Sequence, residues 1–419
     1  MSNIDCLVCH DTTGSYDKNP KGAGMPKSSV DLPYVAKNVG PTSRETCGSC
    51  HFYGGGGDQI KHADLGSELM YPSKNCDIHM GGYDFSCTEC HQATNHKIPG
   101  RSSSVAPSEG AKRCVDCHTN EPHYGDDLLD HHLNEHCEHI NCNTCHSPVY
   151  AKCKPTKTWW DWSQAGNKNR EVKKNEHGKP KYHWKKGVFE WKKFAKPDFA
   201  WYNGYMERIL AGDKVDLEGK VVDPDNPKNV KQNGEYINLT KPVGSKKNPE
   251  SKITPFKLMR GVQGADPVNN LVLVPHLFPY GKDDKTAYWK NLDWNKAFAE
   301  GMEAMDLPYS GEYVWVRTNM YWRIEHEVLP EDKALNCRQC HESLRGEKTC
   351  GRCHQKSRSK DFAELMDKKS NWENMQGLGW DVQKLKNSTD YLNFEELGYE
   401  GDPIIHGGRF KKMPMGKSE

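Results

Sequence analysis

The sequence has few hydrophobic residues and almost no net charge for a chain of its length. Of its 419 residues only 35% are hydrophobic, the mean hydropathy is −0.91 and the formal net charge is +1. Such a chain has no global field to attract nucleic acid. It also has no apolar run long enough to span a membrane, residues 271–274 being among the longest. The sequence therefore favours neither a nucleic-acid-binding protein nor a membrane-spanning protein. It predicts that groups other than aliphatic side chains complete the hydrophobic core.

Cysteine is absent from residues 155–330, although the chain holds 17 cysteines. Outside that stretch the pentapeptide Cys-x-x-Cys-His occurs seven times. The copies are Cys6, Cys9 and His10; Cys47, Cys50 and His51; Cys87, Cys90 and His91; Cys114, Cys117 and His118; Cys142, Cys145 and His146; Cys337, Cys340 and His341; and Cys350, Cys353 and His354. This motif attaches c-type haem, with both thiols on the haem edge and the imidazole on iron. The sequence therefore predicts haem c at seven sites.

Two other uses of these cysteines are less consistent with the spacing. Zinc could be held by the neighbouring pairs Cys337/Cys340 and Cys350/Cys353 in a tetrahedral thiolate site. However, the pairs are closer together than in the usual zinc ribbon, and zinc does not need the histidine after each pair. A disulfide framework is typical of chains under about 100 residues. A multihaem cytochrome c is therefore favoured.

The motifs divide the chain into three expected regions. Residues 1–154 hold five motifs among many turn signals, residues 155–330 are rich in tryptophan, tyrosine and lysine, and residues 331–419 hold two motifs and a mixed tail. Alternating aromatic residues around Lys186-Gly187 predict a hairpin, and apolar spacing over 293–305 predicts a helix. The expected fold is mainly α with extensive loops wrapped around haems, and the central region is expected to contain some β-hairpins.

Each haem iron also needs its sixth position explained. Two histidines saturate the iron and give an electron carrier, whereas an open or weakly filled position can bind substrate. The histidines that lie among or beside the motifs are the predicted distal ligands, with ordinary packing or surface roles as the alternative: His62, His79, His96, His123, His136 and His326. His177 and His183 lie in the basic hairpin and are predicted to be surface residues, and His276 is undecided.

Two features near the motifs remain to be interpreted. The cysteines outside the motifs are Cys76, Cys137 and Cys153, which allow one structural disulfide and one free thiol, or sulfur chemistry at an active site. Four glycines follow the second motif, in FYGGGGD at residues 52–58. They would let backbone pass close to a flat macrocycle, or would form a flexible loop.

The FYGGGGD segment followed by KH resembles the octahaem tetrathionate reductase family of multihaem c-type cytochromes. Other stretches that are similar to this family span nearly the whole chain: DCLVCHDTTG at 5–14, DIHMG at 77–81, CNTCHSPVYAKCKPTKTWWDWSQAG at 142–166, LMRGVQ at 258–263, YWKNLDW at 288–294 and HEVLPEDKAL at 326–335. The resemblance implies an oxidoreductase with mostly bis-histidine haems and one catalytic haem whose distal ligand is a lysine. It also implies reduction of tetrathionate to thiosulfate, with nitrite and hydroxylamine as further substrates.

On this sequence Lys61 matches the family's lysine, and Lys154 and Lys157 are alternatives. An amine binds iron only when it is neutral, so the site must depress its pKa. Asp58 and Asp64 are predicted to orient this amine or manage protons, with loop capping as the alternative. The competing function is an electron conduit in which every haem is bis-histidine and no substrate binds.

The resemblance also carries expectations about the whole protein. The family has further haem motifs before the DCLVCHDTTG segment, so we expect a truncated N-terminus and a catalytic haem attached upstream. Because haem c is attached outside the cytoplasm, a periplasmic or other extracytoplasmic location is expected, although no signal sequence precedes Cys6. The expected partners are a small inorganic anion as substrate and a redox protein or quinol-linked cytochrome as electron donor.

Overall fold

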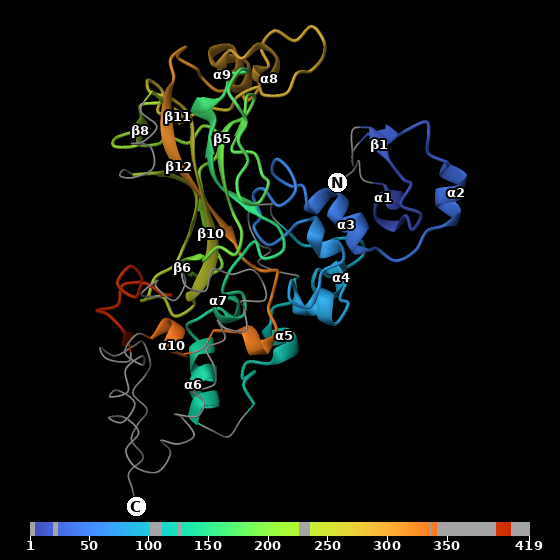
Figure 1. Ribbon diagram of the computed structural model, residues 1–419, viewed down its shortest axis with the longest axis vertical. Helices are drawn as coiled ribbons and strands as arrows, with labels where there is room; N and C mark the ends of the chain where they lie inside the picture. Colours follow the sequence, from blue (N-terminus) through green and yellow to red (C-terminus); the bar gives the residue numbers. More distant parts are fainter. Residues whose placement is uncertain are drawn as a thin grey trace, which may run out of the picture.

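The centre of the molecule is a mixed ten-stranded β-sheet (Figure 1). The computed structural model describes residues 5–19, 24–100, 111–124, 128–225, 235–335, 337–341 and 391–403. The sheet order is β4 (Tyr182–His183), β5 (Gly187–Lys192), β3 (Thr156–Asp161), β10 (Lys252–Asp266), β12 (Val314–Arg323), β9 (Ile237–Pro242) and β7 (Met206–Arg208). In addition, β6 (Asp198–Tyr202) and β11 (Leu271–Val272) pair with β10, and β8 (Val221–Val222) pairs with β12. The pairs β3–β10 and β9–β12 are parallel.

The expectation of a mainly α fold was wrong, because this sheet dominates the central region. Its longest strand, β10, is buried along almost its whole length. A strand covered on both faces loses the alternation of apolar and polar residues that marks a half-exposed strand. The predicted hairpin around Lys186-Gly187 is present as β4 and β5, but it is only one edge of a much larger sheet.

Short helices carry the described haem motifs to one side of the sheet and below it in Figure 1. The helices that contain motif residues are α1 (Cys6–His10), α3 (Arg44–His51), α4 (Cys87–Cys90), α5 (Val115–His118), α7 (Cys142–His146) and α10 (Cys337–Cys340). Asp5, Ser43 and Asn141 cap α1, α3 and α7 through side-chain acceptors. A helix places the two cysteines, three residues apart, on the same face as a haem edge requires. The proposed three-region division stays a prediction.

The remaining helices and strands lie beside the motif helices and the central sheet. Beside the motif helices lie α2 (Leu32–Lys37), α6 (Leu128–Cys137), η1 (Ser67–Met70), η2 (Ile78–Gly82) and a two-stranded sheet of β1 (Lys18–Asn19) and β2 (Met25–Pro26). Short turns form η3 (Trp162–Gln164) and η4 (Glu331–Lys333), and α8 (Tyr288–Asn291) precedes α9. No helix within the described ranges is long and apolar enough to cross a membrane.

The helix predicted over 293–305 is confirmed as α9 (Trp294–Glu303). Asp293 caps it by accepting a hydrogen bond from the backbone N–H of Lys296 at 3.1 Å. Phe298 and Met302 lie on its buried face and pack against the sheet beside Trp159. The periodicity of this segment was therefore sufficient to predict both the helix and its buried face.

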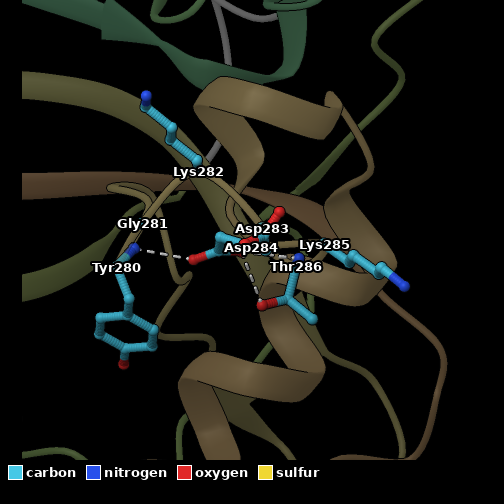
Figure 2. Close-up of a pocket in the computed structure, with 7 residues that line it drawn as sticks. All are labelled: Tyr280, Gly281, Lys282, Asp283, Asp284, Lys285 and Thr286. Carbon is cyan, nitrogen blue, oxygen red and sulfur yellow. Dashed lines mark hydrogen bonds between the residues drawn. The ribbon is translucent and has the colours of Figure 1, made fainter.

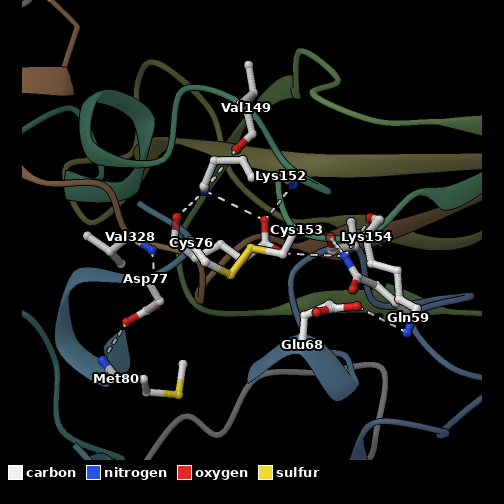
Figure 3. The surroundings of a disulfide bond; sticks show 12 residues. Gln59, Glu68, Cys76, Asp77, Met80, Val149, Lys152, Cys153, Lys154 and Val328 are labelled. Carbon is white, nitrogen blue, oxygen red and sulfur yellow. Dashed lines mark hydrogen bonds and ion pairs between the residues drawn. A yellow bond between two sulfur atoms is a disulfide. The ribbon is translucent and has the colours of Figure 1, made fainter. Parts of the chain in front are cut away.

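A disulfide joins Cys76 to Cys153, with 5.7 Å between the Cα atoms (Figure 3). It ties the loop before η2 to the chain that leads into β3, and Cys137 keeps a free thiol. Of the two interpretations of these cysteines, the structural disulfide is confirmed. The buried side chain of Lys152 lies beside the bridge and donates hydrogen bonds to the carbonyl oxygens of Val149 and Glu327.

Replacing both Cys76 and Cys153 with alanine is expected to lower the free energy of unfolding by about 3 kcal/mol, because the bridge restricts the unfolded chain. The bond spans 77 residues of sequence, a long loop to close. Denaturant titration of the haem-loaded protein would measure the change. Cys137→Ala is the control and should change the free energy by less than about 0.5 kcal/mol. An unchanged denaturation midpoint in the double variant would contradict the prediction.

Candidate functional site

The cysteines of successive motifs lie beside one another in chain order. The thiols of Cys47 and Cys87 form a hydrogen bond, and the thiols of Cys114 and Cys142 form another. The other neighbours lie within electrostatic reach: Cys9 of Cys47, Cys90 of Cys117, and Tyr391 of both Cys145 and Cys340. The first six motifs therefore form a linear series from α1 to α10.

Four motif histidines face a second histidine ring. The ring centroids are 6.1 Å apart for His10 and His96, 6.0 Å for His118 and His79, 6.2 Å for His91 and His326, and 6.2 Å for His341 and His136. A metal bound between two imidazoles by bonds of about 2 Å needs a separation of this size. The residues present therefore fit haem with two axial histidines at these four positions.

The other predicted ligands have different surroundings. His62 packs edge-to-face on Trp322 with 4.6 Å between centroids. The Nδ1 atom of His123 lies 3.1 Å from Asn134 Oδ1, and His123 is within electrostatic reach of His146. Among the described residues, no histidine ring faces His51. Motif seven, with Cys350, Cys353 and His354, and the side chain of Cys337 lie outside the described residues. Haem ligation by these individual residues stays a prediction.

Replacing His96 with alanine should convert one low-spin haem to a high-spin form, because His10 would lose its opposite ligand. Electron paramagnetic resonance of the oxidised protein would measure the change. His177→Ala is the control, since His177 lies in the Lys-rich loop beside Glu176. A spectrum in which His96→Ala matches the wild type would show that His96 is not an iron ligand.

The side chain of Lys61 packs against the glycine-rich turn after α3. Gly55 has φ +97°, and a Cβ atom there would lie 2.6 Å from Lys61 Cδ, so the close approach requires glycine. The Lys61 Nζ atom is 5.8 Å from the centre of the Trp322 ring. Burial lowers the pKa of Lys61, and among the described residues no oxygen accepts a hydrogen bond from its amine. The turn therefore contacts a lysine whose charged form is disfavoured by burial.

Two further lysines lie on the same face of the sheet. Lys257 is fully buried, and its Nζ atom donates hydrogen bonds of 2.7 Å each to Ile60 O, Lys61 O and Thr156 Oγ1. The Lys157 Nζ atom lies 3.3 Å from the Phe189 ring centre and 3.8 Å from that of Trp160. Burial, with a smaller contribution from a neighbouring cation, lowers the pKa of Lys157 to about 6. We call Lys61, Lys157 and Lys257 the lysine cluster.

Lys154, one of the alternatives to Lys61, has a different environment. Its Nζ atom lies 2.5 Å from Asp58 Oδ2 and 3.5 Å from Glu68 Oε1. Partial burial opposes the charge, but these carboxylates outweigh it and raise the pKa of Lys154. Asp58 also accepts hydrogen bonds from the backbone and hydroxyl of Ser67. The structure thus places Asp58 against Lys154 and Ser67, and Lys154 remains a charged ion-pair partner.

Asp64 is buried and organises the segment that carries His326. Its Oδ2 atom accepts hydrogen bonds from Glu325 N at 2.6 Å and His326 N at 2.7 Å, and lies 3.4 Å from His326 Nδ1. Burial would raise the pKa of Asp64, but the hydrogen bonds and charge of His326 lower it to about 2. The carboxylate orients the ring that faces His91, a positioning role not foreseen from the sequence.

His276 has a structural role in a surface loop at the far end of the sheet. Its Nε2 atom lies 2.8 Å from Asp284 Oδ2, and the same carboxylate accepts a hydrogen bond from the backbone of Ala287. Asp284 also accepts hydrogen bonds from the backbone of Tyr280 and Thr286, which are drawn in Figure 2. An open hollow of about 400 Å³ lies over residues 280–286. Both oxygens of Asp284 accept hydrogen bonds from the loop itself, so this carboxylate is not available to bind a ligand in the hollow.

Comparisons with known proteins agree with the motif series. A family profile described as bacterial cytochrome c matches residues 157–344. The structure is similar to the crystal structure of octaheme cytochrome c from Shewanella oneidensis, with a TM-score of 0.73 and 36% sequence identity over 97% of this chain and 78% of that chain. An uncharacterized protein from Archaeoglobus fulgidus is 27% identical over 128 residues, or 26% of this chain and 42% of that protein. This match thus spans less than half of the archaeal protein.

The motif series, the facing histidines and the sheet are together the features of a multihaem c-type cytochrome. At this identity and coverage, the chain belongs to the octaheme cytochrome c family. It therefore carries haem c, and electron transfer follows from a linear series of such groups.

Proposed function

We propose that this protein is a reductase that passes electrons along its haem series to an anion bound beside Lys61. The observation that carries the proposal is the partly buried side chain of Lys61, which packs against the glycine-rich turn near two other lysines. A neutral amine can bind iron weakly and be displaced. Tetrathionate is the preferred substrate, and nitrite and hydroxylamine are alternatives.

The lysine cluster would bind and hold the substrate anion. The bound haem supplies a redox-active iron, and the protein supplies charge and exclusion of water. When protonated, the Lys61 amine would attract the anion through its charge. Lys257 fixes the backbone at Ile60 and Lys61, while Trp160 and Trp322 shield the site. Because the pKa of Lys157 is lowered to about 6 and that of Lys257 well below its usual value, the charge that favours a small oxyanion comes from protonated Lys61.

The protonation of Asp58 and Asp64, the two carboxylates near the site, bears on which substrate the site can reduce. Despite burial, hydrogen bonds lower the pKa of both Asp58 and Asp64, so neither is a ready proton donor. Reduction of tetrathionate cleaves its central S–S bond with two electrons and yields two thiosulfates without uptake of protons. Reduction of nitrite to ammonia needs several protons. Because neither Asp58 nor Asp64 is a ready proton donor, these two carboxylates favour the reduction that needs no protons, that of tetrathionate.

An electron conduit is the second candidate, and the four facing histidine pairs favour it. If every iron has two histidine ligands, no substrate can coordinate. For either function we propose an extracytoplasmic location, in which the disulfide would also be stable. The proposed donor is a redox protein or a quinol-linked cytochrome.

The test mixes the dithionite-reduced, haem-loaded full-length protein, with any haem attached upstream of this chain, with tetrathionate under anaerobic conditions. Rapid haem reoxidation with release of two thiosulfates per tetrathionate would support the reductase. Nitrite and hydroxylamine are compared at the same concentration. If none of the three reoxidises the haems and every haem gives a bis-histidine signal, the reductase is excluded and the conduit remains.

A further inference from the structure

A second cavity lies on the face of the sheet opposite the lysine cluster. Side chains alternate along β10, so Leu258 and Arg260 share the face that Lys257 does not occupy. Tyr321 on β12 lies directly opposite Leu258. These residues line a cavity of about 660 Å³, together with Tyr150, Asp198, Tyr236 and the segment around Tyr391 and Asn393. Its volume is in the range of a small-molecule site.

The cavity combines aromatic walls with an acid–base pair. The Arg260 guanidinium and the Asp198 carboxylate are 4.0 Å apart and both remain partly exposed. Burial raises the pKa of Asp198, and Arg260 only partly offsets this. The charge of Asp198 also acts on the hydroxyls of Tyr150 and Tyr321. A flat ring that carries hydroxyl groups would find both stacking surfaces and hydrogen-bond partners here.

The wall of this cavity is continuous with the last described motif. Asn393 lines the cavity, and the next residue, Phe394, stacks on the His341 ring with 5.5 Å between centroids. Tyr391 contacts the ring of Phe199 on the cavity wall at 5.2 Å and lies within electrostatic reach of Cys145 and Cys340. A molecule in the cavity would therefore lie next to the attachment site at α10, at the opposite end of the series from α1.

We propose that this cavity is an electron-input site for a small, water-soluble hydroquinone. The aromatic walls fit its ring, and Asp198 fits its hydroxyl protons. The cations of the lining, which can contact polar substituents, are balanced by acidic residues: Lys192, Lys196 and Arg260 against Glu190, Asp198 and Glu396. Neither the family nor the lysine cluster assigns this site, and it does not depend on which substrate the other end reduces.

The redox step balances within these groups. The hydroquinone loses two electrons and two protons and leaves as the quinone. The electrons pass singly to the ferric haem next to His341 and then onward along the motif series. The Asp198 carboxylate accepts the first proton, and water at the open side of the cavity accepts the second. Each hydroquinone thus reduces two ferric haems.

The first experiment measures binding without turnover. Oxidised anthraquinone-2,6-disulfonate is titrated into ferric, haem-loaded protein by isothermal titration calorimetry. Saturable binding is expected, and Leu258→Trp, which fills the cavity, should weaken it at least about tenfold, the equivalent of roughly 1.4 kcal/mol. Haem content and thermal unfolding show whether this variant is folded. Absent binding, or binding unaffected by Leu258→Trp in folded protein, would overturn the proposal.

The second experiment follows haem reduction by the reduced quinone in a stopped-flow instrument. Asp198→Asn keeps the shape of the cavity and should slow reduction about tenfold through loss of the proton acceptor. Asp216→Asn, at an exposed carboxylate paired with Lys220, is the matched control. Equal rates in all three proteins would refute the role of Asp198. Dithionite-driven tetrathionate reduction should be unchanged in both cavity variants, so failure here is distinguishable from failure of the reductase proposal.

Discussion

Replacing Lys61 with methionine is expected to lower kcat for tetrathionate reduction by at least about a hundredfold, the usual cost of removing one group that stabilises developing charge. Methionine keeps much of the apolar stem in the turn around Gly55 but removes the amine. Dithionite should still reduce the other haems at the wild-type rate, because their histidine pairs are untouched. Steady-state assays with dithionite as donor measure the loss.

Lys154→Met provides the comparison, since Lys154 was an alternative ligand. Its amine is engaged by Asp58 and Glu68, so its loss should change kcat only a fewfold. A high-spin or altered haem signal in Lys61→Met but not in Lys154→Met would link the kinetic effect to iron ligation. If instead Lys154→Met loses activity and Lys61→Met retains it, the assignment of the lysine is wrong.

Replacing Asp64 with alanine is expected to destabilise the protein by about 4 kcal/mol, because buried donors would lose their acceptor. The change would leave Glu325 N and His326 N without the carboxylate and release the His326 ring. Denaturant titration measures the stability, and the low-spin signal of the haem between His91 and His326 should weaken in the same variant.

Two variants separate the structural and positioning roles of Asp64. Asp64→Asn keeps an oxygen acceptor and should recover more than half of the lost stability. Asp84→Ala removes an exposed carboxylate that pairs with Arg44, and it should cost less than about 1 kcal/mol. If Asp64→Ala unfolds at the wild-type midpoint, the buried hydrogen bonds contribute little and the proposed positioning role fails.

The sequence predicted those features that depend on local spacing. The Cys-x-x-Cys-His motifs indicated haem c, and the periodicity of 293–305 predicted the helix α9. The sheet was missed because β10 is buried on both faces and its partners lie far apart in the sequence. A register shift in β3 between Lys157 and Trp159 also changes which side chains share a face. Simple alternation would have separated Lys157 from Trp160.

The candidate site was only partly accessible to sequence reasoning. The glycine-rich segment indicated Lys61. Nothing in the sequence indicated that Lys257 would donate hydrogen bonds to the backbone carbonyl oxygens of Ile60 and Lys61. The distal histidines could be proposed as a set, yet not assigned to partners. His96 faces His10 and not His91, which is nearer in the sequence. This pairing depends on the fold, which brings the segment around His96 next to α1.

The pairing of His91 with His326 has a consequence for the order of assembly. The cysteines of α4 are made early, whereas His326 follows β12, so the whole central sheet is synthesised between the two ligands. By contrast, His96 becomes available to His10 soon after α4. If His326 is the second ligand predicted for the haem attached beside His91, that haem would keep a single protein ligand until β10 and β12 have paired. Its change of spin state would report the completion of the sheet during maturation.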